Sequence, residues 1–83
     1  MSVNLFRVRI MNFETNKTEY EYFESEKEAK IWCINRSEYY LKVLDSYEDK
    51  DNPNITYQIQ YYAPFDGYIP DYGITMNDSA FSV

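Results

Sequence analysis

The chain has 83 residues, of which 45% are hydrophobic and 19% aromatic, and this composition predicts one small folded domain rather than a disordered chain. Its 14 acidic residues exceed its 8 basic ones and give a net charge of −6, so we expect no cationic groove that binds nucleic acid directly. The chain has no histidine and a single cysteine, which excludes the usual zinc sites, a Ser-His-Asp triad, a Cys-His pair and an intramolecular disulfide.

The cellular compartment is predicted from two sequence signals, a signal peptide and a membrane-spanning segment. The first residues show no signal-peptide pattern, and no apolar stretch approaches the length of a membrane span. The lone Cys33 has no partner in the chain, which is typical of a reducing interior. We therefore expect a cytoplasmic protein with no membrane partner.

Two alternating runs near the N-terminus predict a β-hairpin. Residues 3–13 and 19–23 alternate with period two, and the polar residues 14–18 between them are typical of a turn. The residues expected on the core side are the even-numbered ones, Phe6, Val8, Ile10, Tyr20 and Tyr22. Arg7 and Arg9 are then expected to share the outer face with Glu19 and Glu21, where each cross-strand ion pair would contribute about 0.2–1 kcal/mol.

A helix is predicted to begin near Glu26. Ser25 and Glu28 match the capping-box pattern Ser-x-x-Glu, in which each side chain bonds the other residue's amide. Ala29, Trp32, Cys33 and Arg36 follow at helical spacing and form the expected core stripe. Trp32 and Cys33 are therefore interpreted as core residues rather than as reactive groups.

The sequence allows two alternative positions for the end of this helix. One alternative continues the helix through Leu41 and Leu44 to about Tyr47, and the other ends it near 35–37 and follows it with a third strand over 38–47. Alternation and aromatic content favour the strand. A loop over 49–54 and a cleanly alternating last strand over 55–62 follow.

These elements predict an α+β fold: a small antiparallel sheet of about four strands, in the order ββαββ, with one amphipathic helix packed on one face. Residues 1–63 are expected to form the single domain. Residues 64–83 are expected to form an irregular tail, punctuated by Pro64, Gly67, Pro70 and Gly73, whose aromatic residues pack on the domain or on a partner.

No residue is predicted to be catalytic, to bind a cofactor or to hold a metal. The loop with Asp45, Glu48, Asp49 and Asp51 gathers carboxylates, but Pro53 stands at a ligand position and the glycine of a calcium loop is missing. The two glycines both lie in the tail, so there is no glycine-rich phosphate loop. We therefore expect a protein that is not an enzyme.

Two features indicate a surface that binds another protein. Glutamates crowd the second strand and the helix start, where complementary charge would attract a basic surface. Ten tyrosines are present, and tyrosine is enriched at protein interfaces. The predicted contact residues are Glu19, Glu21, Glu24, Glu26, Tyr40, Glu48, Asp49, Asp51, Tyr62, Tyr68 and Tyr72.

In its size, its acidity and its lack of catalytic motifs, the chain resembles the small proteins that phages and mobile elements use to inhibit host or defence proteins. This resemblance is one of type and carries over no motif or residue. It implies a non-enzymatic inhibitor that acts through its acidic, Tyr-rich surface. Separately, carboxylates spaced along a strand and a helix could imitate the phosphate backbone of a nucleic acid. The alternative is an assembly protein that forms a homodimer or larger self-association through a sheet edge and the aromatic tail.

Overall fold

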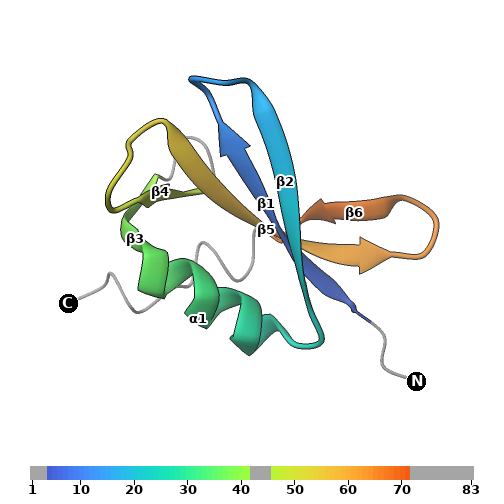
Figure 1. Ribbon diagram of the computed structural model, residues 1–83. Coiled ribbons are helices and arrows are strands. Elements are labelled where there is room, and N and C mark those ends of the chain that lie inside the picture. The colour runs from blue at the N-terminus through green and yellow to red at the C-terminus, as the bar shows by residue number, and fades with distance from the viewer. Residues whose placement is uncertain (1–3, 42–45, 72–83) are drawn as a thin grey trace.

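The computed structural model describes residues 4–41 and 46–71, with the backbone alone described for 39–41. Within these ranges the chain forms a small α+β fold with one helix and an antiparallel sheet (Figure 1). The elements in chain order are β1 (Phe6–Asn12), β2 (Lys17–Phe23), α1 (Glu26–Arg36), β3 (Ser37–Leu41), β4 (Ser46–Asp49), β5 (Ile55–Ala63) and β6 (Gly67–Pro70).

β5 is the central strand of the sheet. One of its edges pairs with β1 over Ile55–Tyr61, and the other pairs first with β4 and then, over Gln60–Ala63, with β6. The strand order is β2-β1-β5-β4-β3, with β6 off this path against the second half of β5. The sheet therefore consists of two hairpins and a short strand arranged around one long strand.

The helix packs across one face of this sheet and forms the core with it (Figure 1). Ser25 caps the helix by accepting a hydrogen bond from the Glu28 amide (3.2 Å), as predicted. The second bond differs from the prediction, because the Ser25 hydroxyl itself donates to the Glu28 carboxylate (3.2 Å). The buried core residues are Val8, Ala29, Cys33, Tyr47, Tyr57 and Ile59.

The helix ends at Arg36, so the favoured end near residues 35–37 is confirmed and the alternative of a long helix to Tyr47 is wrong. The segment expected to form one strand over 38–47 instead contributes to β3 and to β4, which pair with each other antiparallel. The connection between them, residues 42–45, lies outside the described residues. Of the segment expected to form a tail, Gly67–Pro70 form β6, and residues 72–83 lie outside the described residues.

The pairing of β1 with β2 corrects the predicted faces of the first hairpin. Its loop has four residues, 13–16, so even-numbered residues of one strand lie opposite odd-numbered residues of the other. Arg9 lies opposite Tyr20 and Arg7 opposite Tyr22, and the predicted pairs of these arginines with Glu19 and Glu21 are wrong. Asn16 closes the loop with a φ of 59°, a left-handed conformation that asparagine tolerates.

The corrected register also moves tyrosines out of the predicted core. Tyr20 and Tyr22 share the face of Arg7 and Arg9, which is the face opposite the helix, and we call it the open face. On β5, Tyr57 is buried on the helix side, whereas Tyr61 is 38% exposed near the end of the strand. Within the described ranges, no helix has the length and apolar character needed to cross a membrane.

The packing of the core predicts that truncating two different isoleucines to alanine lowers the unfolding free energy by very different amounts. Ile59 is fully buried on β5, so Ile59→Ala should cost about 2–5 kcal/mol of unfolding free energy. Ile31→Ala, at a position that is 47% exposed on α1, is the matched control and should change it by about 0.5 kcal/mol or less. Urea titrations followed by Trp32 fluorescence would measure both, and equal losses would contradict this description of the core.

Candidate functional site

An acidic strip follows the chain from the outermost strand β2 into the first turn of α1. Its residues are all exposed: Glu19, Glu21, Glu24, Glu26 and Glu28. Glu19 and Glu21 stand opposite Ile10 and Val8 in the register, and so lie on the helix side of the edge strand. The two glutamates at the start of α1 also favour the helix through its dipole.

One residue of the acidic strip lies against a further carboxylate. Glu26 is in hydrogen-bonding contact with Asp71, a buried residue that follows β6. Desolvation, the hydrogen bond to Asp71 and the charge of Asp71 together raise the pKa of Glu26, although Lys30 opposes this rise. The fold therefore places two acids together at this point, and a second source of positive charge would be favourable there.

The carboxyl pair predicts a specific pH dependence. Because the pKa of Glu26 is raised in the folded protein, its protonated form stabilises the fold, and this contribution is lost as the pH rises through the folded pKa. Glu26→Gln keeps the size and can donate to Asp71, so it should raise the melting temperature at pH 7. The gain should shrink as the pH falls towards 4, where the wild-type carboxyl also takes up a proton.

Glu24→Gln is the matched control for this measurement, because Glu24 is an exposed neighbour on the same strip. It should leave the melting temperature nearly unchanged at either pH. Scanning calorimetry of the three proteins at pH 7 and pH 4 would decide the matter, and a lower melting temperature for Glu26→Gln at pH 7 would contradict the prediction.

The other predicted acidic contacts lie elsewhere in the sheet. Glu48 and Asp49 belong to β4 and Asp51 to the loop that follows it, and β1 and β5 separate β4 from β2. The structure therefore does not bring these three residues into the acidic strip. In the described part of the chain, no group of three or more acidic or cysteine side chains is arranged to hold a metal ion.

Asp49 organises the loop between β4 and β5. Its carboxylate accepts hydrogen bonds from the backbone amides of Asp51 and Asn52 (both 2.9 Å) and from the hydroxyl of Tyr57. Desolvation alone would raise the pKa of Asp49, but these hydrogen bonds and Lys50 outweigh it and lower the pKa. Burial and the carboxylate acceptor raise the pKa of Tyr57 above its usual range.

This network predicts that acid removes part of the stability. Because the pKa of Asp49 is lowered on folding, its contribution is present above the unfolded pKa and is lost as the pH falls through the folded value. Tyr57→Phe should cost about 1.5–3 kcal/mol at pH 7, the range for a hydrogen bond to a charged group, and the cost should decline below about pH 4.

Tyr61→Phe provides the control, since Tyr61 lies on the same strand but is partly exposed. The unfolding free energy of the Tyr61→Phe variant should match that of the wild type at every pH. Urea titrations between pH 3 and pH 7 would test the pair of variants. A cost for Tyr57→Phe that stays constant over this range would show that the Asp49 carboxylate is not its acceptor.

Tyrosines gather on the open face, and we call Tyr20, Tyr22, Tyr62 and Tyr68 the tyrosine cluster. Tyr62 and Tyr68 are register partners on β5 and β6 with ring centroids 5.4 Å apart, and Tyr22 reaches Tyr68 at 5.9 Å. Of the four tyrosines predicted as contacts, Tyr62 and Tyr68 therefore do come together. The Tyr40 side chain and Tyr72 lie outside the described residues.

The contact between Tyr22 and Tyr68 crosses the open face above two other strands. β2 and β6 are separated by β1 and β5, which corresponds to about 14 Å along a flat sheet. The two side chains therefore lean towards each other across β1 and β5. The twist of the sheet around β5 is visible in Figure 1.

Arg7 lies on the open face beside these tyrosines and is held by three neighbours. Its guanidinium carbon lies 4.0 Å from the centre of the Tyr20 ring and 4.2 Å from that of Tyr68, and its Nε donates to Gln60 Oε1 (2.7 Å). Gln60 in turn donates to Gln58 (3.0 Å). Each cation–π contact contributes about 0.5–2 kcal/mol. Arg7 is thus a structural part of the tyrosine cluster.

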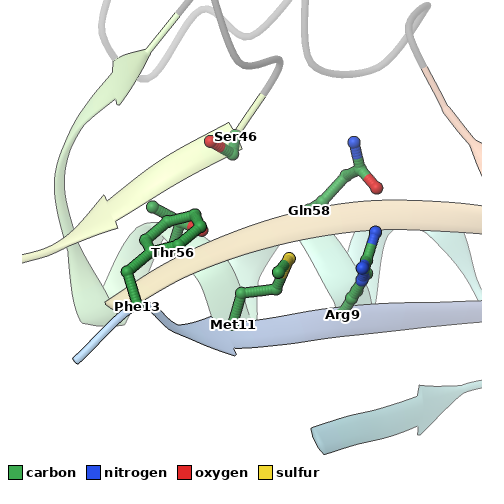
Figure 2. A pocket seen from close by; sticks show the side chains of 6 residues that line it. All are labelled: Arg9, Met11, Phe13, Ser46, Thr56 and Gln58. Carbon is green, nitrogen blue, oxygen red and sulfur yellow. The ribbon is translucent and has the colours of Figure 1, made fainter. Parts of the chain in front are cut away.

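A pocket of about 200 Å³ opens beside this cluster on the open face (Figure 2). The side chains that line it come from β1, β4, β5 and the first loop: Arg9, Met11, Phe13, Ser46, Thr56 and Gln58. Figure 2 shows the side chains of Arg9 and Gln58 rising next to each other from neighbouring strands. The predicted contact residues include none of the six, because they meet only when the register of β1, β5 and β4 is known.

Comparisons with protein-family models, curated proteins and solved structures find no match for the chain.

Proposed function

We propose that this protein is a small, non-enzymatic module that binds another protein through the acidic strip, and that the partner presents a basic surface. The observation that carries the proposal is the separation of charge. The exposed carboxylates run along β2 into α1, whereas Arg7 and Arg9 stand on the opposite face of the sheet among tyrosines and glutamines. The acidic strip is consequently not neutralised by these arginines.

The environment of Glu26 supports a cationic partner. Desolvation and the neighbouring Asp71 raise the pKa of Glu26, so the charge of its carboxylate is disfavoured in the free protein. A lysine or arginine brought to this point by a partner would relieve that repulsion. Charge complementarity of this kind increases the rate of association and selects the partner, and it is weakened by salt.

The spacing on β2 supports a more specific form of the proposal, in which the acidic strip imitates a nucleic-acid backbone. Glu19 and Glu21 are two residues apart on one strand, which places them about 6.7 Å apart. This is about twice the 3.4 Å axial spacing of charges along one DNA strand. A protein with a nucleic-acid channel is therefore a suitable partner, and an inhibitor encoded by a phage or mobile element is the biological role that we propose.

The test compares two double charge reversals with the same change in net charge. Glu19→Lys with Glu21→Lys changes the acidic strip, and Glu38→Lys with Asp66→Lys changes exposed acids on β3 and at the β5–β6 turn. Each tagged protein is used to capture partners from a lysate of the native host, and bound protein is eluted by a salt gradient.

We expect the wild type and the β3/turn variant to retain one stoichiometric basic protein and to release it at moderate salt. The β2 variant should capture at least about tenfold less of this basic protein. The reason is that residues 19 and 21 then repel the basic groups of the partner instead of attracting them. Equal capture by all three proteins would contradict a role for the acidic strip. Recovery of the protein's own chain alone would instead favour self-association through the exposed edge strand β2.

A further inference from the structure

Two of the residues that line the pocket on the open face each have a buried side-chain atom with no hydrogen-bond partner among the described residues. Arg9 Nε and Ser46 Oγ are both buried, and neither has a hydrogen-bond partner in the structure as described. Ser46 itself is only 4% exposed. Leaving such groups unpaired costs free energy, so buried polar atoms are nearly always satisfied in folded proteins. Two residues that have such atoms line one pocket, and this indicates a site that a ligand completes.

Arg9 differs in this respect from Arg7, its neighbour on the same strand and face. The Arg7 side chain is engaged by two tyrosine rings and by Gln60. The Arg9 side chain lines the pocket beside Gln58, its register partner on β5 (Figure 2). The sheet thus holds one arginine as part of its own structure and presents the other to the pocket.

The remaining walls determine the size and polarity of the occupant. Met11 and the half-exposed Phe13 form an apolar wall, and Thr56 adds a hydroxyl group. The volume of about 200 Å³ is somewhat larger than the 150 Å³ cavity that holds benzene in another protein. An aromatic ring or short aliphatic body with one charged group would fill it.

We propose that this pocket binds a small organic anion, whose carboxylate or phosphate oxygens accept hydrogen bonds from Arg9 and Ser46 and whose apolar body packs against Met11 and Phe13. A guanidinium is suited to such oxygens because it donates two parallel hydrogen bonds. This site is separate from the acidic strip, so it can be present whether or not the strip binds a partner.

The test is a nuclear magnetic resonance titration of the full-length, ¹⁵N-labelled protein. The probes are benzoate, phenyl phosphate and, as the uncharged control, benzyl alcohol. Benzoate or phenyl phosphate should shift the backbone amide signals of Arg9, Met11, Thr56 and Gln58 in a saturable manner. Benzyl alcohol should bind at least about tenfold more weakly, since it lacks the charge that Arg9 recognises.

Variants separate the role of Arg9 from a general effect of charge. Arg9→Gln should weaken benzoate binding at least about tenfold, because a hydrogen-bonded charge pair is lost. Two control variants each remove one positive charge: Arg7→Gln from β1, the strand of Arg9, and Lys17→Gln from β2. Each should change the affinity for benzoate by about twofold or less. The Lys17 variant keeps the comparison valid if loss of the Arg7 contacts disturbs the fold.

Ser46→Ala distinguishes a binding role from a structural one. If the hydroxyl serves a ligand, this variant should bind benzoate more weakly while its melting temperature is unchanged or higher, because an unsatisfied buried group is removed. A lower melting temperature with unchanged affinity would overturn the proposed role of Ser46.

The source of the anion is tested by comparing benzoate with a short peptide that ends in a phenylalanine carboxylate. Tighter binding of the peptide would assign the site to a protein C-terminus, and tighter binding of benzoate or phenyl phosphate would assign it to a free small molecule. Each anion is added from about 20-fold excess over the protein up to about 20 mM. The proposal is overturned if none of the three anions causes saturable shifts in this range. It is also overturned if Arg9→Gln binds benzoate as tightly as the wild type does.

Discussion

The register between β1 and β2 decides on which face each charge of the N-terminal hairpin lies. Its four-residue loop pairs even-numbered with odd-numbered residues, so Tyr20 and Tyr22 join the arginines while Glu19 and Glu21 occupy the other face. A slip by one residue would exchange the two faces of β2 completely. The acidic strip, the tyrosine cluster and the environment of both arginines depend on this one pairing.

Within that arrangement, Arg7 and Arg9 have different roles although they lie two residues apart on β1 and share one face of the sheet. Arg7 lies at the end of the open face where β6 pairs with β5, so Tyr68 can cover it and Gln60 can bind its Nε. Arg9 lies further along β1, beside the pocket, where β4 supplies Ser46 instead of an aromatic ring. One edge of β5 pairs first with β4 and then with β6, and this change of partner separates an arginine held by tyrosine rings from one that lines the pocket.

Local patterns in the sequence were sufficient for the elements that depend on neighbouring residues. The pair of Ser25 and Glu28 predicted the start of the helix, and the alternation around Ile59 predicted the central strand. The faces of β2 were predicted wrongly because they depend on the parity of a loop, which alternation within each strand does not specify. The split of residues 38–47 and the pairing of β6 were missed because both arise from pairing between strands rather than from composition.

The same limit applies to the candidate sites. The glutamates of the acidic strip are contiguous in the chain and could be proposed from the sequence, whereas the pocket draws Arg9, Ser46 and Gln58 from three strands that are distant in the sequence. The raised pKa of Glu26 also depends on Asp71, which the fold alone brings to the helix start. Sequence reasoning therefore identified the surface made from one segment and missed the site made from several.

The pairing of β1 with β5 has a consequence for how the molecule forms during synthesis. The first hairpin and the helix are local and can form early, but β1 must wait for residues 55–61 before its second edge is covered. Such long-range pairing slows folding, because a long loop has to close before the contacts that stabilise it can form. The contacts of Arg7 require Tyr20 and also Tyr68, so a chain emerging from a ribosome acquires its finished open face only after Tyr68 has been made.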